Sequence, residues 1–125
     1  MSKSVSSSCT LQVSGDGISI TGSGAPTAIT QTGTQNIGNT QNIGFAAGEA
    51  LVLGDVSASI AAPLKVCFKN LDTTNYVMVN TADSWDTPQI VLKPGEFACF
   101  PTSIATWYAK ADTAAVDLWV QACEF

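Results

Sequence analysis

The second half of the chain alternates short apolar runs with turn-forming residues, which is typical of a β-sheet protein. No segment longer than ten residues shows an apolar stripe at 3.6-residue spacing with a cap at its start, so we expect little helix. We predict an all-β fold: an antiparallel β-sandwich, jelly-roll-like, with its core in residues 49–125. The expected strands lie in the apolar runs 51–53, 64–69, 76–79, 90–92, 97–100, 106–110 and 116–122.

Two loops between these runs have strong turn chemistry. In Lys93-Pro94-Gly95-Glu96, proline fixes φ at the second position and glycine accepts a positive φ at the third, as a type II turn requires. The polar segment 70–75 predicts a turn capped by Asn and Asp side chains, and it should join two strands of a hairpin. The runs on either side of 93–96 are apolar on both faces, so we expect them to be central strands covered on both sides.

In the last apolar run, 116–122, each side chain can be assigned to one face of the strand, because successive side chains of a strand point to opposite faces. One face should carry the apolar residues Val116, Leu118, Val120 and Ala122. The other should carry Asp117, Trp119, Gln121 and Cys123.

Four aromatic residues are candidates for a protein interface, since exposed aromatic side chains usually mark contacts with another protein. Trp119 falls on a polar face, Trp85 lies in a loop, Tyr108 shares a face with Lys110, and Phe125 is the last residue. Two alternatives stay open: these side chains could cover the ends of the core, or they could stack on sugar rings as in a carbohydrate-binding module.

The first 48 residues contain few bulky side chains and are rich in Ser, Thr, Gly, Gln and Asn. A hairpin is expected around Asp16 and Gly17. The unit TQNIG then occurs twice, at 34–38 and 40–44. This region is either an arm that lies along a neighbouring subunit or a strand pair with Ile37 and Ile43 in the core. We expect residues 1–48 to contribute strands and inter-subunit contacts to what is one domain overall.

Composition excludes several functions. Charged residues make up 12% of the chain, the formal net charge is −5, and there is neither histidine nor arginine. A Ser-His-Asp triad, a Cys-His dyad and a His-ligated metal are therefore excluded. Five lysines in an acidic chain do not make a nucleic-acid footprint. We find neither a membrane span nor the apolar stretch of a signal peptide, and we expect synthesis in the cytoplasm.

The four cysteines, Cys9, Cys67, Cys99 and Cys123, are far apart and form no C-x-x-C pair, so zinc is not expected. Two disulfides could pair in three ways, but the missing secretory signal favours reduced, packed thiols. Alternation places Cys67 on one face between two lysines, which would favour a thiolate. A small residue beneath a subunit contact explains this position equally well.

The acidic segment Asp83-Ser84-Trp85-Asp86 offers oxygen ligands for calcium, but it lacks the alternating ligand pattern of a calcium loop. Asp and Ser are common at turns because they bond nearby backbone N–H groups. We therefore expect no catalytic residue, no cofactor and no metal site, and we expect that the protein is not an enzyme.

Several segments resemble a family of small proteins encoded among the structural genes of tailed bacteriophages. The most specific are Lys69-Asn70-Leu71-Asp72 and Asn75-Tyr76. The resemblance covers residues 34–120. Within this range, the other similar segments are 41–44, 49–51, 53–56, 92–96 and 108–114.

The resemblance implies a virion component without enzymatic activity, made in the host cytoplasm. The function it favours is a capsid decoration (cement) protein that binds the major capsid protein as a homo-oligomer. A homotrimer is expected because such subunits tend to occupy local three-fold positions. The alternatives are a structural component of the tail or neck and the carbohydrate-binding module named above. Neither nucleic acid nor membrane is expected as a partner.

Overall fold

The computed structural model describes residues 3–5, 9–15, 18–24, 29–31, 36–51 and 64–124, with side chains in 38–51 and 65–123. The chain divides into two compact units, Met1–Thr32 and Gly33–Phe125. Each is described by itself.

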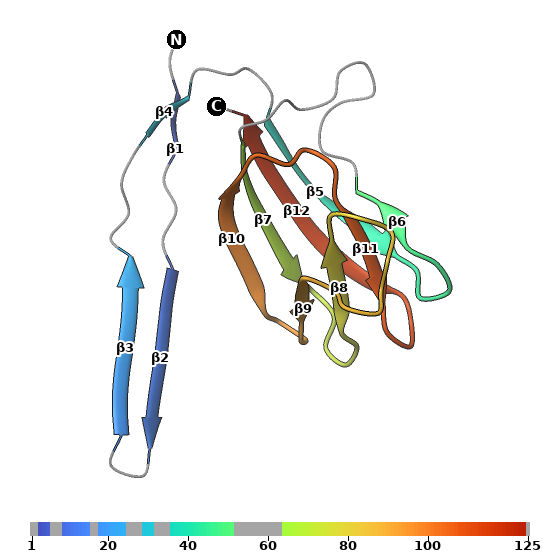
Figure 1. Ribbon diagram of the computed structural model, residues 1–125, viewed down its shortest axis with the longest axis horizontal. Helices are drawn as coiled ribbons and strands as arrows, with labels where there is room; N and C mark the ends of the chain where they lie inside the picture. The colour runs from blue at the N-terminus through green and yellow to red at the C-terminus, as the bar shows by residue number, and fades with distance from the viewer. Residues whose placement is uncertain are drawn as a thin grey trace. The chain divides into compact units, whose positions relative to one another are not determined.

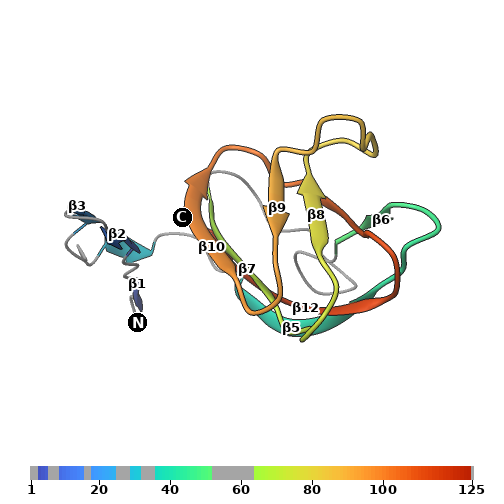
Figure 2. The ribbon, with the colours of Figure 1, turned by 90° about the horizontal axis from the view of Figure 1, so that it is seen from below.

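The larger unit is a sandwich of two four-stranded antiparallel sheets, seen edge-on in Figure 2, which confirms the predicted fold class. The first sheet has the order β10-β7-β12-β5 and consists of β10 (Phe97–Thr102), β7 (Leu64–Asn70), β12 (Val116–Glu124) and β5 (Asn36–Ile43). The second has the order β6-β11-β8-β9 and consists of β6 (Glu49–Ala50), β11 (Tyr108–Ala111), β8 (Val77–Asn80) and β9 (Ile90–Leu92).

Among the described strands of this unit, every two that are consecutive along the chain lie in different sheets, except β8 and β9. The order of these eight described strands is that of a jelly roll. The predicted hairpin across residues 64–79 is therefore wrong, because β7 and β8 belong to different sheets. Both strands bury apolar side chains against the same core, and the six-residue turn is long enough to span the ~10 Å between packed sheets.

The four connections β5–β6, β7–β8, β9–β10 and β11–β12 lie together at one end of the sandwich, the lower end in Figure 1. We call residues 44–48, 71–76, 93–96 and 112–115 the four-loop end.

The runs 90–92 and 97–100 were predicted to be central strands, but β9 and β10 are edge strands. Their outward side chains are exposed: Val91 by 47% and Phe97 by 63%. Pro101 suits the edge position of β10, because it lacks the N–H that a second neighbouring strand would need. The outward faces of β9 and β10 are apolar in sequence because Val91 and Phe97 are exposed there and Cys99 is bonded to a cysteine of β7.

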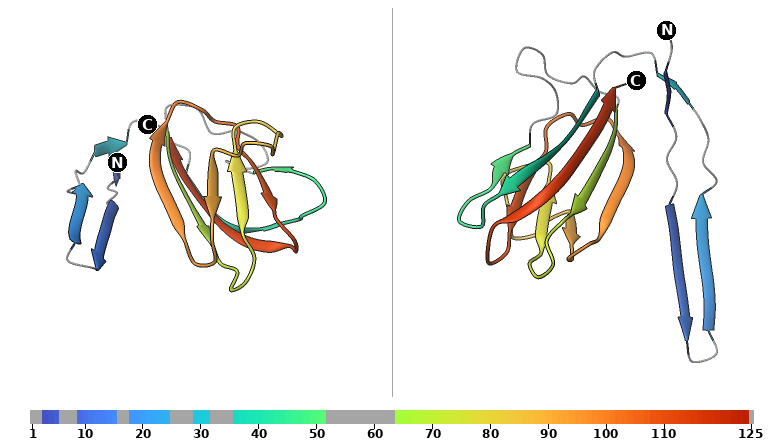
Figure 3. Two further views of the ribbon diagram at one scale, coloured as in Figure 1. Left: turned by 60° about the horizontal axis from the view of Figure 1, so that its bottom comes forward. Right: turned by 180° about the vertical axis from the view of Figure 1, so that it is seen from behind.

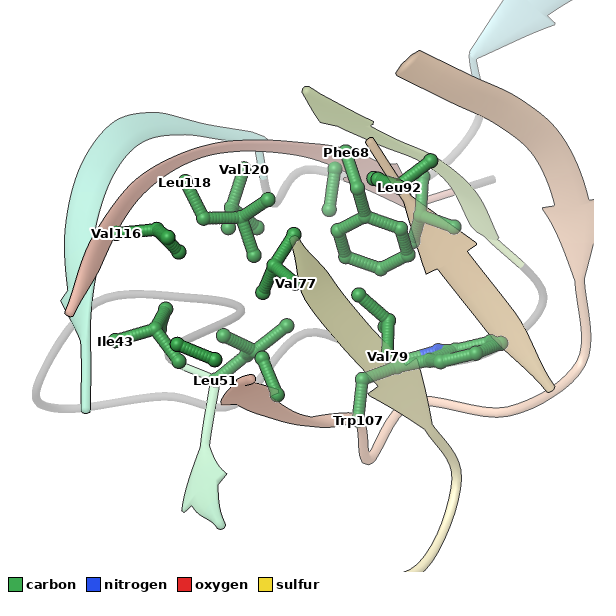
Figure 4. Close-up of a cluster of buried hydrophobic side chains, with 14 residues drawn as sticks. Ile43, Leu51, Phe68, Val77, Val79, Leu92, Trp107, Val116, Leu118 and Val120 are labelled. Carbon is green, nitrogen blue, oxygen red and sulfur yellow. The ribbon is translucent and has the colours of Figure 1, made fainter. Parts of the chain in front are cut away.

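The core lies between the two sheets, as Figure 4 shows for its larger side chains. An aromatic cluster fills part of it: the ring of Trp107 lies 5.5 Å from that of Phe68 and 5.4 Å from that of Phe100. The Trp107 indole N–H donates a 2.9 Å hydrogen bond to the carbonyl oxygen of Ile104, so the buried indole keeps a polar partner. The predicted alternation of β12 is confirmed, since Val116, Leu118, Val120 and Ala122 are all buried.

The strand β5 contains the last three residues of the first TQNIG copy and the first four of the second, and it pairs along β12. The Ile43 side chain is buried, with 2% of it exposed. The side chain of Ile37 is not among those that the structure describes. Residues 36–43 are therefore a strand of the sandwich.

The smaller unit consists of two-stranded pairings (Figure 3). β2 (Cys9–Gly15) pairs antiparallel with β3 (Ile18–Gly24) in a register that runs from Cys9 opposite Gly24 to Gly15 opposite Ile18. This confirms the predicted hairpin, although Asp16 and Gly17 themselves lie outside the described residues. β1 (Lys3–Val5) pairs antiparallel with β4 (Ile29–Gln31).

Candidate functional site

Trp119 lies on the outward face of the first sheet, half-buried, with Lys69 and Thr40 opposite it on the neighbouring strands. Its ring extends over Gly38 on β5, where an added Cβ would come within 3.2 Å of the indole Cζ2. Glycine therefore leaves room for the ring against the strand, and the indole covers backbone that glycine would leave bare.

Tyr108 belongs to the other sheet. It is half-buried on β11, between Asn80 of β8 and Ala50 of β6, and its neighbour Ala109 faces the core. The predicted face shared by Tyr108 and Lys110 is confirmed by their burial, because both are half-buried while Ala109 and Ala111 are buried.

Trp85 is fixed within its own loop. Its indole N–H donates a 2.7 Å hydrogen bond to Asp83 Oδ1, and a Cβ on Gly48 would overlap both side chains. Asp83 thus holds the Trp85 indole, and its partner is a side chain instead of the backbone N–H group expected of a turn residue. Among the residues that the structure describes, no group of three metal-ligating side chains lies close enough to hold a metal ion.

The predicted interface residues are therefore not brought together on one surface. Trp119 and Tyr108 lie on the outward faces of opposite sheets, and Trp85 lies beside Gly48. Phe125 is outside the described residues.

A different set of exposed apolar side chains gathers at the four-loop end. Phe45 is 51% exposed, Leu71 44% and Tyr76 40%, and Phe97, which is 63% exposed, follows the 93–96 turn directly. The sequence patterns did not identify these residues as candidates. Leu71 and Tyr76 belong to the 71–76 loop, whereas Phe45 and Phe97 come from two other segments, and the jelly-roll connections bring the three segments to the same end.

Each of the four loops is fixed by a carboxylate that accepts backbone N–H bonds. Glu49 Oε2 accepts from Gly44 at 2.7 Å. Glu96 Oε2 accepts from Lys93 at 2.8 Å. Asp72 Oδ2 and Asp112 Oδ1 accept pairs of bonds, from Thr74 and Asn75 and from Tyr76 and Thr113 respectively. Such charge-assisted bonds are stronger than neutral ones, so they hold the loops in defined conformations.

The loops are also joined to each other in series. The N–H of Gly95 donates to the carbonyl of Asn70, and the N–H of Asn70 donates to the carbonyl of Glu96. The hydroxyl of Thr113 donates to Asn75 Oδ1 at 3.0 Å, and the N–H of Ala111 donates to the carbonyl of Gly44 at 3.0 Å. No buried polar side-chain atom in the described part of the chain lacks a partner. The four-loop end is therefore rigid.

The predicted type II turn is confirmed within this end. Gly95 has φ of +79°, and the N–H of Glu96 donates to the carbonyl of Lys93 at 3.0 Å. The predicted capping role of the 70–75 segment is confirmed as well. Two backbone N–H bonds, from Asn75 and Thr74, hold the pKa of the Asp72 carboxyl below its ordinary value.

The cysteines differ from the expectation of reduced thiols. Cys67 and Cys99 lie directly opposite each other on β7 and β10 and form a disulfide. Pairing depends on strand register, which cysteine spacing does not reveal. Cys67 does share the outward face with Lys65 and Lys69, as predicted, but a bonded cysteine cannot act as a thiolate.

Cys123 is a free thiol on the same outward face as Cys67. Burial raises its pKa, and the opposing effect of the nearby Lys65 is smaller. The thiol is therefore protonated at neutral pH and is a poor nucleophile toward the disulfide.

No protein-family model matches the chain, and neither the curated proteins nor the solved structures yield a match. The described residues include no helix long and apolar enough to cross a membrane.

Proposed function

We propose that this chain is a virion structural protein of a tailed bacteriophage, a capsid decoration protein without enzymatic activity. In this proposal it assembles as a homotrimer and binds the major capsid protein of the head. The resemblance over residues 34–120 supports the class of protein, and the jelly-roll sandwich gives it a stiff scaffold.

The observation that carries the proposal is the two-stranded ribbon β2–β3 of the smaller unit. Each strand has seven residues, and among the described strands each pairs only with the other. A single two-stranded hairpin is marginally stable in water, and its outer edges offer unpaired N–H and C=O groups to another strand. Pairing with a neighbouring subunit would satisfy both needs, so the ribbon suits an inter-subunit arm.

Two further features agree with a role in the virion. A disulfide such as Cys67–Cys99 persists in oxidising surroundings, which a particle meets outside the cell. The low content of charged residues, 12%, limits repulsion when many copies pack on one shell.

Sedimentation of the full chain, alone and with empty heads assembled from the major capsid protein of the encoding phage, tests the proposal. We expect a trimer that sediments with the heads. Removing residues 1–32 should leave a folded sandwich, because the core residues that the structure describes all lie between Ile43 and Ala122 in the sequence. This shortened chain should be monomeric.

A full chain that stays monomeric at high concentration and does not sediment with heads would contradict the proposal. Imaging of the particle distinguishes the head from the tail or neck, since a tail component would form rings on the tail axis.

A further inference from the structure

We infer that the four-loop end is a docking surface for a protein partner whose matching surface is apolar at its centre and basic around it. Within the proposed function, on which this inference rests, the partner is the capsid shell. The end is apolar, rigid and acidic, and each property restricts what can bind there.

The apolar property comes from the distribution of exposed side chains. Six large hydrophobic residues of the described part of the chain are exposed, and four of them, Phe45, Leu71, Tyr76 and Phe97, lie in or beside the four loops. The other two are Val91 on β9 and Ile104, which follows β10. Aromatic side chains are enriched among the residues that dominate binding energy at protein interfaces.

Hydrogen bonds fix the backbone at two of these residues, Leu71 and Tyr76. The backbone N–H of Leu71 donates to the carbonyl of Asp117 at 2.9 Å. The backbone of Tyr76 exchanges two bonds with Asp112: its N–H donates to Oδ1, and its carbonyl accepts from the Asp112 N–H. Because the backbone is already held in place, binding would cost little ordering of the loops.

Charge selects the partner. The four loops contain three carboxylates, those of Asp72, Glu96 and Asp112, and one ammonium group, that of Lys93. At the borders of the loops, Glu49 and Asp117 add two acids, and Lys69 and Lys110 add two ammonium groups. The loops and their borders thus have a net charge of −2. This net charge disfavours nucleic acid or a second copy of the same end, whereas lysines or arginines around an apolar patch would complement it.

The test measures binding of full-length protein to the same empty heads by co-sedimentation. The double variant Leu71→Ser/Tyr76→Ser removes two exposed anchors, and we expect at least about tenfold weaker binding. The matched control Val91→Ser/Ile104→Ser removes two apolar side chains that are equally exposed but lie outside the four-loop end. It should bind as wild type does.

A second pair of variants tests charge at one exposed position of the 112–115 loop. Ala114→Lys should weaken binding, whereas Ala114→Glu should maintain or strengthen it, and added salt should weaken wild-type binding. Thermal melts of all variants identify any that misfold, and the Ala114 pair keeps the inference testable if the double variant does.

Wild-type binding that the double variant retains within about twofold overturns the inference while leaving the proposed function intact. The same holds if Ala114→Lys and Ala114→Glu bind equally well, or if the double variant loses trimer formation instead of head binding, which would make a second copy the occupant. If wild type itself does not bind heads, the proposed function fails and the inference fails with it.

Discussion

The side-chain amide of Asn70 donates a 3.0 Å hydrogen bond to the carbonyl oxygen of Leu92, and this bond crosses the sandwich from one sheet to the other. Asn70 is fully buried. The same amide donates to the carbonyl of Asn75 at 2.8 Å, and its oxygen accepts the N–H of Asp72 at 2.9 Å. One buried polar side chain therefore fixes the end of β7, the following turn and the end of β9.

Replacing Asn70 with alanine should lower the free energy of unfolding by about 3 kcal/mol, because two carbonyl groups and one N–H lose their partner. Urea denaturation measures the change. The control is Asn42→Ala, which removes an exposed amide bonded to Asp117 Oδ1 and should cost less than about 0.5 kcal/mol. Equal effects at both positions would contradict the role given to Asn70.

Acid should weaken the fold through Asp72. Its pKa is held below the ordinary 3.8 by the N–H bonds of Asn75 and Thr74. The ionised carboxylate therefore stabilises the folded state above the unfolded pKa, and this contribution is lost as pH falls through the lower, folded pKa.

The urea midpoints of wild type and Asp72→Asn, measured from pH 7 to pH 2, check this behaviour. Wild type should have the higher midpoint at pH 7, and the difference should shrink below about pH 4. A difference that stays constant with pH would mean that the charge of Asp72 is not involved.

Loss of the Cys67–Cys99 disulfide should destabilise the protein by about 3 to 4 kcal/mol, as expected for a cross-link that closes a loop of 32 residues. The double variant Cys67→Ser/Cys99→Ser and wild type in reducing agent should show similar melting temperatures. Cys123→Ser is the matched control and should melt near wild type. If reducing agent leaves the wild-type melting temperature unchanged, the disulfide is absent from the protein in solution.

Gly48→Ala should displace the Trp85 indole, because the added Cβ would overlap both Trp85 and Asp83. Breaking the Asp83–Trp85 bond should cost about 1 kcal/mol and shift the tryptophan fluorescence. Gly44→Ala is the control, since its Cβ would lie at an ordinary 3.8 Å from Glu49 Oε2. Unchanged fluorescence in Gly48→Ala would place the indole elsewhere.

Local patterns predicted the local structure of this protein well. Alternation assigned the side chains of β12 to the correct faces, and the proline and glycine of the 93–96 turn fixed its type. Both depend on residues a few positions apart, so the sequence contains the needed information.

Features that depend on distant segments were missed. A six-residue turn can close a hairpin or cross between sheets, so the β7–β8 crossover could not be told from its sequence. The Cys67–Cys99 bond needs the register of β7 against β10. The four-loop end needs the whole topology, because Phe45 and Phe97 are 52 positions apart in the sequence. An available signal for the edge position of β10 was Pro101, which cannot donate to a second neighbour.

The position of β12 has a consequence for synthesis of the protein. Among the described strands of the sandwich, β12 comes last along the chain, yet it lies between β7 and β5 in its sheet and is the strand partner of β5. During synthesis, β5 therefore stays unpaired until β12 has been made. A chain that is cut before residue 116 cannot complete this sheet.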